Sequence, residues 1–293
     1  MHPKLKSAIV NSIEAATGAS FKIGHLDTCD GGCINHAVIL SNGNRSYFVK
    51  LNDACKLDMF EAEAAGLQAI ANTKTIQAPR PITQGSACGS AFLVLEALDF
   101  GTGNTDAWFQ MGQQLAAMHR HTSNHFGWHR DNTIGSTRQI NTKAKHWDAF
   151  FRDQRLGYQL KLARQNGYLF KGTEALISTI PQLLEGHKPD ASLLHGDLWS
   201  GNVGFTTCGN PAIYDPASYY GDRETDLAFS EYFGGFPAAF YQGYHTTWPL
   251  PPDYPKRKRL YNLYHVLNHA NLFGGGYANE AQGMINQLLA SQS

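Results

Sequence analysis

Three polar residues in one short segment, Asp197, Asn202 and Asp215, have side chains that could carry out chemistry. The segment reads LLHGDLWSGNVGFTTCGNPAIYDPA, and apolar runs at 192–194 and 212–214 predict two buried strands joined as a hairpin. Such a hairpin would present the three side chains at one edge. Two carboxylates and an amide oxygen form an all-oxygen set that suits Mg²⁺, and one carboxylate would remain to orient or deprotonate a hydroxyl.

The composition argues against several classes of protein. The 293 residues include 24 basic and 24 acidic side chains, so the formal net charge is zero and neither nucleic acid nor an anionic membrane is indicated as a partner. No apolar run reaches the roughly 18 residues that would span a bilayer. The N-terminus is typical of an amphipathic helix rather than a signal peptide, so we expect a cytoplasmic protein. Five scattered cysteines without a CxxC pair indicate neither a structural zinc site nor a disulfide framework.

The N-terminal third has the pattern of a small sheet with one helix before it. A helix is predicted over 3–17, with Gly18 as its C-cap. The β-prone runs that follow lie at 21–23, 36–40 and 47–51, and the Asn-Gly pair within 41–44 predicts a turn between the last two.

A glycine pair and a lysine within this sheet could contact a ligand. Gly31-Gly32 is compatible with a tight hairpin, which we favour on this pattern alone, or with a loop whose backbone amides approach a polyphosphate. Lys50 falls inside the run at 47–51.

A predicted helix over 59–70 carries a carboxylate on its apolar face. Glu63 shares that face with Phe60, Leu67 and Ile70. A buried carboxylate is costly unless it is paired, and Lys50 on the preceding strand is the natural partner. Glu61 is the competing choice, with a solvated surface position as the other interpretation.

The remainder of the chain is mostly helical in pattern. The continuous apolar run at 91–96 predicts a buried strand, and residues 97–104 form a glycine-containing link. Beyond the link, helices are predicted over 105–121, 146–165, 172–184, 222–233, 255–269 and 279–290. The segment 126–142 lacks periodicity, which suits either a ligand-binding loop or simple packing. We therefore expect an α+β fold of two lobes, with residues 1–98 forming a small β-rich lobe and 99–293 a larger helical one.

The order of these parts is that of proteins that transfer phosphate from ATP: a lysine held by a helix glutamate, a glycine turn, and an Asp and Asn that could bind metal. The motifs that carry this order are GGCINHA, FVKLN, HGDLWSGN and DPASYYGDRE. Together they closely resemble the fructosamine kinase (ketosamine-3-kinase) family, over residues 8–289. The resemblance implies an aminoglycoside-phosphotransferase-like member of the protein-kinase-like fold.

The resemblance also implies roles for individual residues. Asp197 corresponds to the catalytic base, and Asn202 and Asp215 to the ligands of Mg²⁺. The remaining correspondences concern ATP: Lys50 would contact its phosphates with Glu63 as helix partner, Gly31 and Gly32 would form the nucleotide loop, and Glu96 to Leu98 would be the hinge that hydrogen-bonds adenine. His195 is interpreted as a structural residue of the loop.

Residues near the acceptor sugar are less constrained by the motifs. Trp199, Asp222 and His269, with parts of 126–142, are predicted to line the sugar pocket, although Trp199 could instead anchor its loop as a core aromatic. Cys33 in the glycine loop is either a redox switch of the ATP site or a small apolar turn residue. The protein would accordingly be a monomer or a redox-dependent homodimer.

The expected reaction is phosphorylation of the 3-hydroxyl of a ketosamine, which destabilises the sugar adduct and frees the amine. Fructosamines, ribulosamines and erythrulosamines, free or protein-bound, all fit the resemblance. An aminoglycoside, choline or homoserine kinase of the same fold is the enzymatic alternative. A non-catalytic nucleotide-binding protein is the other.

Overall fold

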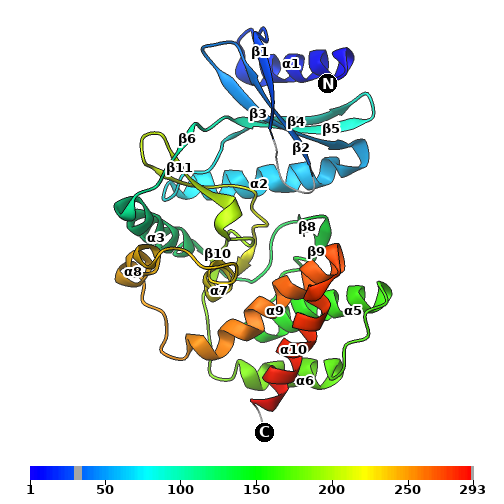
Figure 1. Cartoon of the computed structure of the whole chain (residues 1–293), viewed down its shortest axis with the longest axis vertical. Helices are drawn as coiled ribbons and strands as arrows, with labels where there is room; N and C mark the ends of the chain where they lie inside the picture. The colour runs from blue at the N-terminus through cyan, green and yellow to red at the C-terminus, as the bar shows by residue number, and fades with distance from the viewer. Residues whose placement is uncertain (30–34, 292–293) are drawn as a thin grey trace.

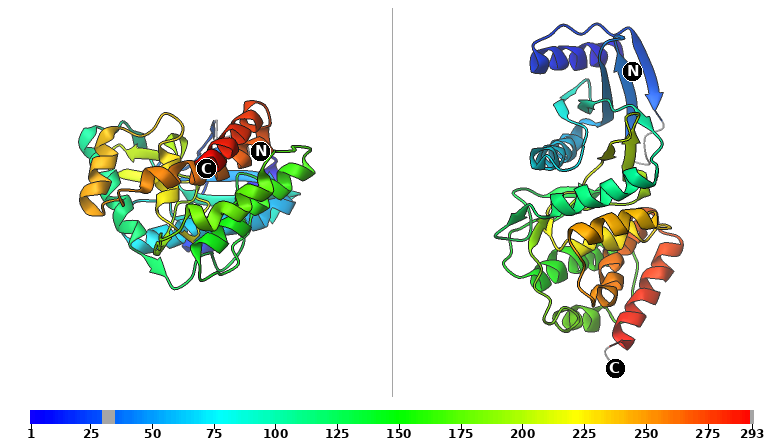
Figure 2. Two further views of the ribbon diagram at one scale, coloured as in Figure 1. Left: turned by 90° about the horizontal axis from the view of Figure 1, so that it is seen from below. Right: turned by 90° about the vertical axis from the view of Figure 1, so that its left-hand side faces the viewer.

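The computed structural model describes residues 1–29 and 35–291. Gly31, Gly32 and Cys33 therefore lie outside the described residues. Figures 1 and 2 show two lobes, one above the other, with the N-terminus in the upper lobe and the C-terminus at the far end of the lower lobe. This is the predicted α+β architecture. No helix among the described residues is long and apolar enough to cross a membrane.

The upper lobe is a five-stranded antiparallel sheet with the strand order β1-β2-β3-β5-β4. Its elements are α1 (Pro3–Thr17), β1 (His25–Cys29), β2 (His36–Ser41), β3 (Ser46–Asp53), α2 (Leu57–Thr73), β4 (Pro81–Ala87) and β5 (Ser90–Glu96). The helices cover opposite faces: α1 lies above the sheet in Figure 1, and α2 lies below it, next to the lower lobe.

Alternation along the strands divides the sheet between these two helices. Tyr47 and Val49 of β3 pack with α1, in a cluster that also contains Ile9 and Ile13. Successive side chains on a strand point to opposite faces, so Phe48 and Lys50 face the other way, toward α2 and the lower lobe. The lysine is thereby placed on the face that looks into the space between the lobes.

Most helices and strands of this lobe were predicted from the sequence, with two errors. The run at 21–23 is not a strand; Phe21 instead packs into the α1 core, and β1 starts at His25. The strand β4 was missed, because Pro81–Ala87 lacks a regular apolar alternation.

The lower lobe is built mainly from helices. These are α3 (Thr105–His119), α4 (Trp147–Phe150), a π-helical stretch (Phe151–Gly157), α5 (Tyr158–Gln165), α6 (Thr173–Leu183), α7 (Glu224–Ser230), α8 (Ala238–Thr247), α9 (Tyr254–Phe273) and α10 (Gly276–Ala290). The helix predicted over 222–233 is shorter than expected, and α8 was not predicted. The chain leaves the upper sheet at Glu96, and the boundary between residues 98 and 99 remains our proposal.

Short strands hold the polar loops of this lobe. They are β6 (Phe100–Gly101), β7 (Thr122–Ser123), β8 (Asn132–Ile134), β9 (Thr137–Gln139), β10 (Ala191–Leu193), β11 (Val203–Thr206), β12 (Pro211–Ile213) and β13 (Tyr220–Gly221). The predicted pairing of 192–194 with 212–214 is wrong. The strand β10 lies between β13 and β7, whereas β12 pairs with β11. The hairpin turn is therefore 207–210. The loop with Asp197 connects β10, in one sheet, to β11, in another.

The segment 126–142 is packed against both lobes. Gly127 exchanges backbone hydrogen bonds of 2.8 and 2.9 Å with Tyr220. Arg130 reaches α2, where it pairs with Asp58 and Glu61. This segment, interpreted from the sequence as either a ligand-binding loop or simple packing, thus connects the upper helix to the lower lobe.

Candidate active site

A cavity of about 650 Å³ lies between the lobes and contains most of the residues singled out in the sequence. Its described lining includes residues of β2, β3 and β5 on the sheet face toward the lower lobe. The loops around 197–202 and 214–217 and the end of α9 complete it. The volume is in the range of small-molecule sites. Nine predicted site residues line it: Lys50, Glu63, Glu96, Leu98, Asp197, Trp199, Asn202, Asp215 and His269.

Lys50 is the centre of an ion-pair cluster at the back of this cavity. Its Nζ lies 2.7 Å from Glu63 Oε1 and 2.6 Å from Asp215 Oδ1, and the residue is only 4% exposed. Burial alone would lower the pKa of Lys50, but the carboxylates of Glu63 and Asp215 more than offset it and raise the pKa above its ordinary value. Burial raises the pKa of Glu63, yet the short contact to an ammonium favours the ionised pair. Lys50 is therefore a fixed positive charge.

The choice between Glu63 and Glu61 is settled by the helix face. Glu63 faces the sheet and contacts Lys50, as predicted. Glu61 points away, with 41% of its side chain exposed and Arg130 at 3.3 Å. The position of α2 thereby determines whether the Lys50 contact forms.

The loop that contains Asp197 is held by its backbone. Gly196 has φ of +84°, and a Cβ there would lie 2.2 Å from the carbonyl oxygen of Ala217, so only glycine fits. His195 Nε2 donates to the Tyr214 carbonyl at 2.9 Å, while its Nδ1 accepts from the Asp197 amide at 3.2 Å. Burial lowers the pKa of His195, so the ring is neutral. This geometry agrees with a structural role for His195.

Asp226 on α7 is a site residue that sequence reasoning missed. Its carboxylate accepts hydrogen bonds from the backbone amides of His195 at 2.7 Å and Gly196 at 2.8 Å. His119 Nε2 lies 3.1 Å from the same carboxylate. Burial would raise the pKa of Asp226, but these donors lower it below its ordinary value. A buried, ionised Asp226 thus fixes the turn before Asp197; an acidic residue in the DPASYYGDRETD continuation was the available signal.

Asp197 lines the cavity, and Asn202 is the one side chain among the described residues that bonds to its carboxyl group. Asn202 Nδ2 donates to its Oδ2 at 3.0 Å and to its backbone carbonyl at 2.8 Å. Burial raises the pKa of Asp197 to about 7, and the nearby charges of Asp215 and Asp226 act in the same direction. A carboxylate with such a pKa is a stronger base than an exposed aspartate.

Asn202 and Asp215 supply oxygen atoms suited to a hard cation. Asn202 uses its amide nitrogen on Asp197, which leaves Oδ1 for a ligand. Asp215 Oδ1 accepts a hydrogen bond from Lys50, and no described donor pairs with its Oδ2. Its φ of +57° lies in the left-handed region, which a non-glycine residue adopts rarely. Carboxylate and amide oxygens are the ligands that Mg²⁺ prefers, so this pair fits the predicted metal.

The predicted hinge also lies on the cavity wall, and one of its amides is available. The Glu96 amide donates to the Arg80 carbonyl at 2.9 Å, and the Ala97 amide donates to the Ser46 carbonyl at 3.3 Å. Among the described residues no acceptor is paired with the Leu98 amide. This N–H is the donor that a flat heterocycle at the hinge could use.

Two of the three predicted sugar residues line the cavity. Trp199 is 36% exposed and His269 is half-buried at the end of α9. Asp222 does not reach the cavity. Its Oδ2 is held at 2.6 Å by both His187 Nε2 and Tyr261 Oη, in the interior of the lower lobe. The assignment of Asp222 to the sugar pocket is corrected accordingly: it packs within the lobe.

The lower wall of the cavity includes residues that sequence reasoning placed only loosely. Asn132, Thr133, Ile134 and Gly135 of the 126–142 segment line it. Asn132 Nδ2 donates to the Ser218 carbonyl at 2.8 Å, close in sequence to Asp215. The segment therefore contributes both to the wall and to the support of the turn that follows Asp215.

Comparisons with known proteins agree with this geometry. A sequence profile described as fructosamine kinase matches residues 5–291. A probable ketoamine kinase of Synechocystis is 53% identical over 282 residues, which cover 96% of each chain. The chloroplastic protein-ribulosamine 3-kinase of Arabidopsis thaliana is 42% identical over 278 residues, 93% of this chain and 85% of that protein. A solved structure from Haemophilus somnus, named as a candidate fructosamine-3-kinase, superimposes with a TM-score of 0.90 at 31% identity and covers 96% of each chain.

Proposed function

The chain belongs to the fructosamine kinase family, and we propose that it transfers the γ-phosphate of ATP to the 3-hydroxyl of a ketosamine. The observation that carries this proposal is the convergence of Lys50, Asp197, Asn202 and Asp215 on one cavity between the lobes. The names of the ketoamine and ribulosamine kinases among its relatives support the same acceptor class.

Binding of ATP would use both lobes. The Leu98 amide would donate to the adenine, and the Lys50 ammonium would contact the phosphates. Asn202 and Asp215 would hold Mg²⁺, which would supply positive charge to offset that of the phosphates. Because Lys50 is buried and already fixed by Glu63, it would lose little side-chain freedom on binding.

Asp197 would serve the acceptor. Its carboxylate accepts the proton of the 3-hydroxyl as that oxygen bonds to the γ-phosphorus, while the bond from phosphorus to the leaving ADP oxygen breaks. Asn202 holds one carboxylate oxygen, which directs the other toward the cavity. Phosphate is a better leaving group than hydroxide, so the phosphorylated adduct would decompose and release the amine, a deglycation.

The lining of the cavity argues against a polycationic acceptor. Its described acidic side chains are Glu63, Glu96, Asp197 and Asp215. Glu63 is paired with Lys50, Glu96 Oε2 lies 3.4 Å from the Arg80 amide, and the other two are assigned to the reaction. An aminoglycoside kinase needs further carboxylates for its ammonium groups. We therefore favour the ketosamine over the aminoglycoside, choline and homoserine alternatives.

The proposal is tested by ATP consumption with a panel of acceptors. Fructosamine, ribulosamine and erythrulosamine adducts of lysine are compared with an aminoglycoside, choline and homoserine, and ³¹P NMR locates the phosphate on the product. We expect ketosamine-dependent turnover with phosphate on O3. Turnover with an aminoglycoside or choline and none with any ketosamine would overturn the assignment.

Four further sequence-based expectations stay predictions. The nucleotide loop of Gly31 and Gly32 and the redox role of Cys33 concern residues outside the described ranges. A monomer or a redox-dependent homodimer is compatible with the chain, and a cytoplasmic location is our proposal from the sequence.

A further inference from the structure

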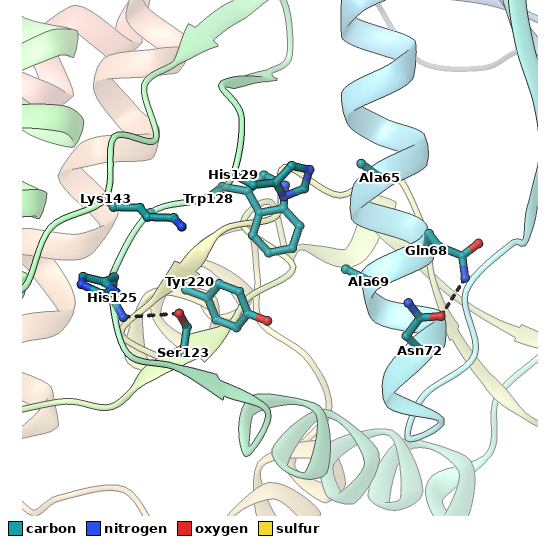
Figure 3. Close-up of a pocket in the computed structure, with 11 residues that line it drawn as sticks. Ala65, Gln68, Ala69, Asn72, Ser123, His125, Trp128, His129, Lys143 and Tyr220 are labelled. Atoms are coloured by element: carbon teal, nitrogen blue, oxygen red, sulfur yellow. Dashed lines mark hydrogen bonds between the residues drawn. The ribbon is translucent and has the colours of Figure 1, made fainter.

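A second cavity of about 440 Å³ lies on the side of α2 away from Lys50. Figure 3 shows that α2 forms one wall and that the start of the 126–142 segment and β13 form the other. The described residues that line it are Ala65, Gln68, Ala69, Asn72, Ser123, His125, Gly127, Trp128, His129, Lys143 and Tyr220. None of them takes part in the proposed phosphate transfer, so this cavity is a separate feature.

The second cavity has basic side chains and no carboxylate in its described lining. None of its described lining residues is acidic, and no described carboxylate lies within ion-pair distance of Lys143. In Figure 3 the Lys143 ammonium points toward the space in front of Trp128, and the Tyr220 hydroxyl points toward α2. Burial lowers the pKa of His129, and the charges of Arg130 and Lys143 lower it further. Lys143, which contributes to this shift, has no described carboxylate as a counter-ion, and this favours an anion.

The other surfaces of the cavity suit a small ring with hydroxyl groups. The rings of Trp128 and Tyr220 lie 5.3 Å apart, inclined by 37°, and present an apolar wall. On α2, Gln68 Nε2 donates to Asn72 Oδ1 at 2.8 Å, which leaves the Gln68 carbonyl and the Asn72 amino group for a ligand. A purely aromatic ligand would leave these amide groups unpaired, whereas sugar hydroxyls can hydrogen-bond both.

We propose that the second cavity binds a small sugar phosphate, with its phosphate at Lys143 and its ring between Trp128 and α2. The phosphate of such a compound carries about −1.5 to −2 charges at pH 7, which matches a lysine flanked by histidines. The volume is also in the range of roughly 300–1,000 Å³ that is usual for sites of small ligands.

Binding in the second cavity would affect the proposed ATP site through α2. Gln68 and Asn72 lie one to three helical turns beyond Glu63, which holds Lys50. A ligand that joins α2 to the lower lobe through Lys143 favours one position of the helix, and so changes the affinity for ATP. We expect a change in KM for ATP. This consequence rests on the proposed kinase function, whereas the binding itself does not.

The binding is measured by isothermal titration of ribose 5-phosphate into protein saturated with ADP and Mg²⁺, which fills the first cavity. We expect saturable 1:1 binding to the unaltered protein. Lys143→Gln should weaken it at least about tenfold, the factor of 1.4 kcal/mol. Lys145→Gln is the matched control, because it removes the same charge two residues away. Lys145 is exposed and does not line the cavity, so this variant should bind ribose 5-phosphate normally.

A second variant tests the cavity without changing charge. Ala69→Leu places a larger side chain in the α2 wall and should abolish binding of ribose 5-phosphate, while unchanged ATP turnover shows that the protein is folded. Three results would overturn the proposal: no saturable binding to the unaltered protein, equal weakening by Lys143→Gln and Lys145→Gln, or binding of inorganic phosphate or unphosphorylated ribose as tight as that of ribose 5-phosphate. Failure of the acceptor panel would leave this titration unaffected, so the two proposals fail separately.

Discussion

Asp226 contributes to the site although it does not reach the cavity. It holds the backbone amides of His195 and Gly196, and the turn that they form carries Asp197. Neither the motif nor the local periodicity predicts such a contact, since it joins a helix to a loop about 30 residues earlier in the chain. Sequence reasoning finds residues whose own chemistry is conspicuous, and it misses those that act by holding another residue's backbone.

The substitution Asp226→Asn should lower the stability of the protein and its turnover together. An amide in place of the carboxylate can accept from one of the two backbone amides but presents a donor to the other. We expect the free energy of unfolding, measured in urea, to fall by about 3 kcal/mol. Asp253→Asn is the control, because Asp253 is 53% exposed in its pair with Arg257 and its loss should cost less than about 1 kcal/mol. Equal losses in the two variants would contradict the role given to Asp226.

Asp222 shows the opposite error at the residue scale. It lies in the same motif as Asp215, and that proximity in sequence suggested the sugar pocket. In the structure it is 1% exposed and bonded to His187 and Tyr261, which come from distant parts of the chain. Whether a polar side chain in a motif faces a cavity or the interior depends on partners that the motif does not contain.

At the scale of elements, α2 was predicted with its functional face. The spacing of its apolar residues put Glu63 on the buried side, and the structure places it 2.7 Å from Lys50. The polar hairpin shows the limit of the same reasoning. Its three side chains do come together, but through β10, β11 and β12 in two different sheets, because short apolar runs do not specify their pairing partner.

Substitutions on α2 should separate its two glutamates. In Glu63→Gln the lysine loses its charged partner and its fixed position, so we expect kcat/KM for ATP to fall by about 10- to 100-fold. Glu61→Gln changes the same functional group two residues earlier, on the exposed side, and should have little effect. Steady-state kinetics with varied ATP provides the measurement, and a larger effect from Glu61→Gln would refute the assignment of the Lys50 partner.

The contact between α3 and α8 depends on two glycines. A Cβ on Gly112 would lie 2.0 Å from the carbonyl oxygen of Phe240, and one on Gly243 would lie 2.0 Å from that of Phe109. Since the obstacle is backbone, Gly112→Ala must separate the helices, and we expect thermal unfolding to show a loss of at least about 2 kcal/mol. Gly283→Ala on α10 meets no atom within 4 Å and should instead stabilise by about 0.5–1 kcal/mol. The two substitutions are therefore expected to change the stability of the protein in opposite directions, and comparing them tests the packing of α3 on α8.

For the whole molecule, the two lobes meet at the first cavity, which is the proposed ATP site. The upper lobe supplies Lys50 and the hinge, and the lower lobe supplies Asp197, Asn202 and Asp215. The sequence predicted this division because the lysine strand and the polar motif are far apart in the chain and separated by a link. It did not predict that 126–142 connects the lobes through Arg130, since that contact needs the folded position of α2.

A ligand that contacts both lobes should stabilise the whole protein. A non-hydrolysable ATP analogue with Mg²⁺, at 100 times its Kd, should add about 2.7 kcal/mol to the free energy of unfolding and raise Tm. Removal of the metal with EDTA should abolish most of this shift, and Asp215→Asn should behave as if the metal were absent. A shift that is the same with and without EDTA would show that Asn202 and Asp215 are not metal ligands.

We propose that Asp197 is the base that accepts the proton of the ketosamine 3-hydroxyl. The turnover of ATP with a ketosamine by the Asp197→Asn variant tests this role. An amide of the same size still accepts from Asn202 but cannot take the proton of the 3-hydroxyl. We predict that kcat falls by about 10²- to 10⁴-fold with KM for ATP little changed. Turnover near that of the unaltered protein would show that Asp197 is not the base.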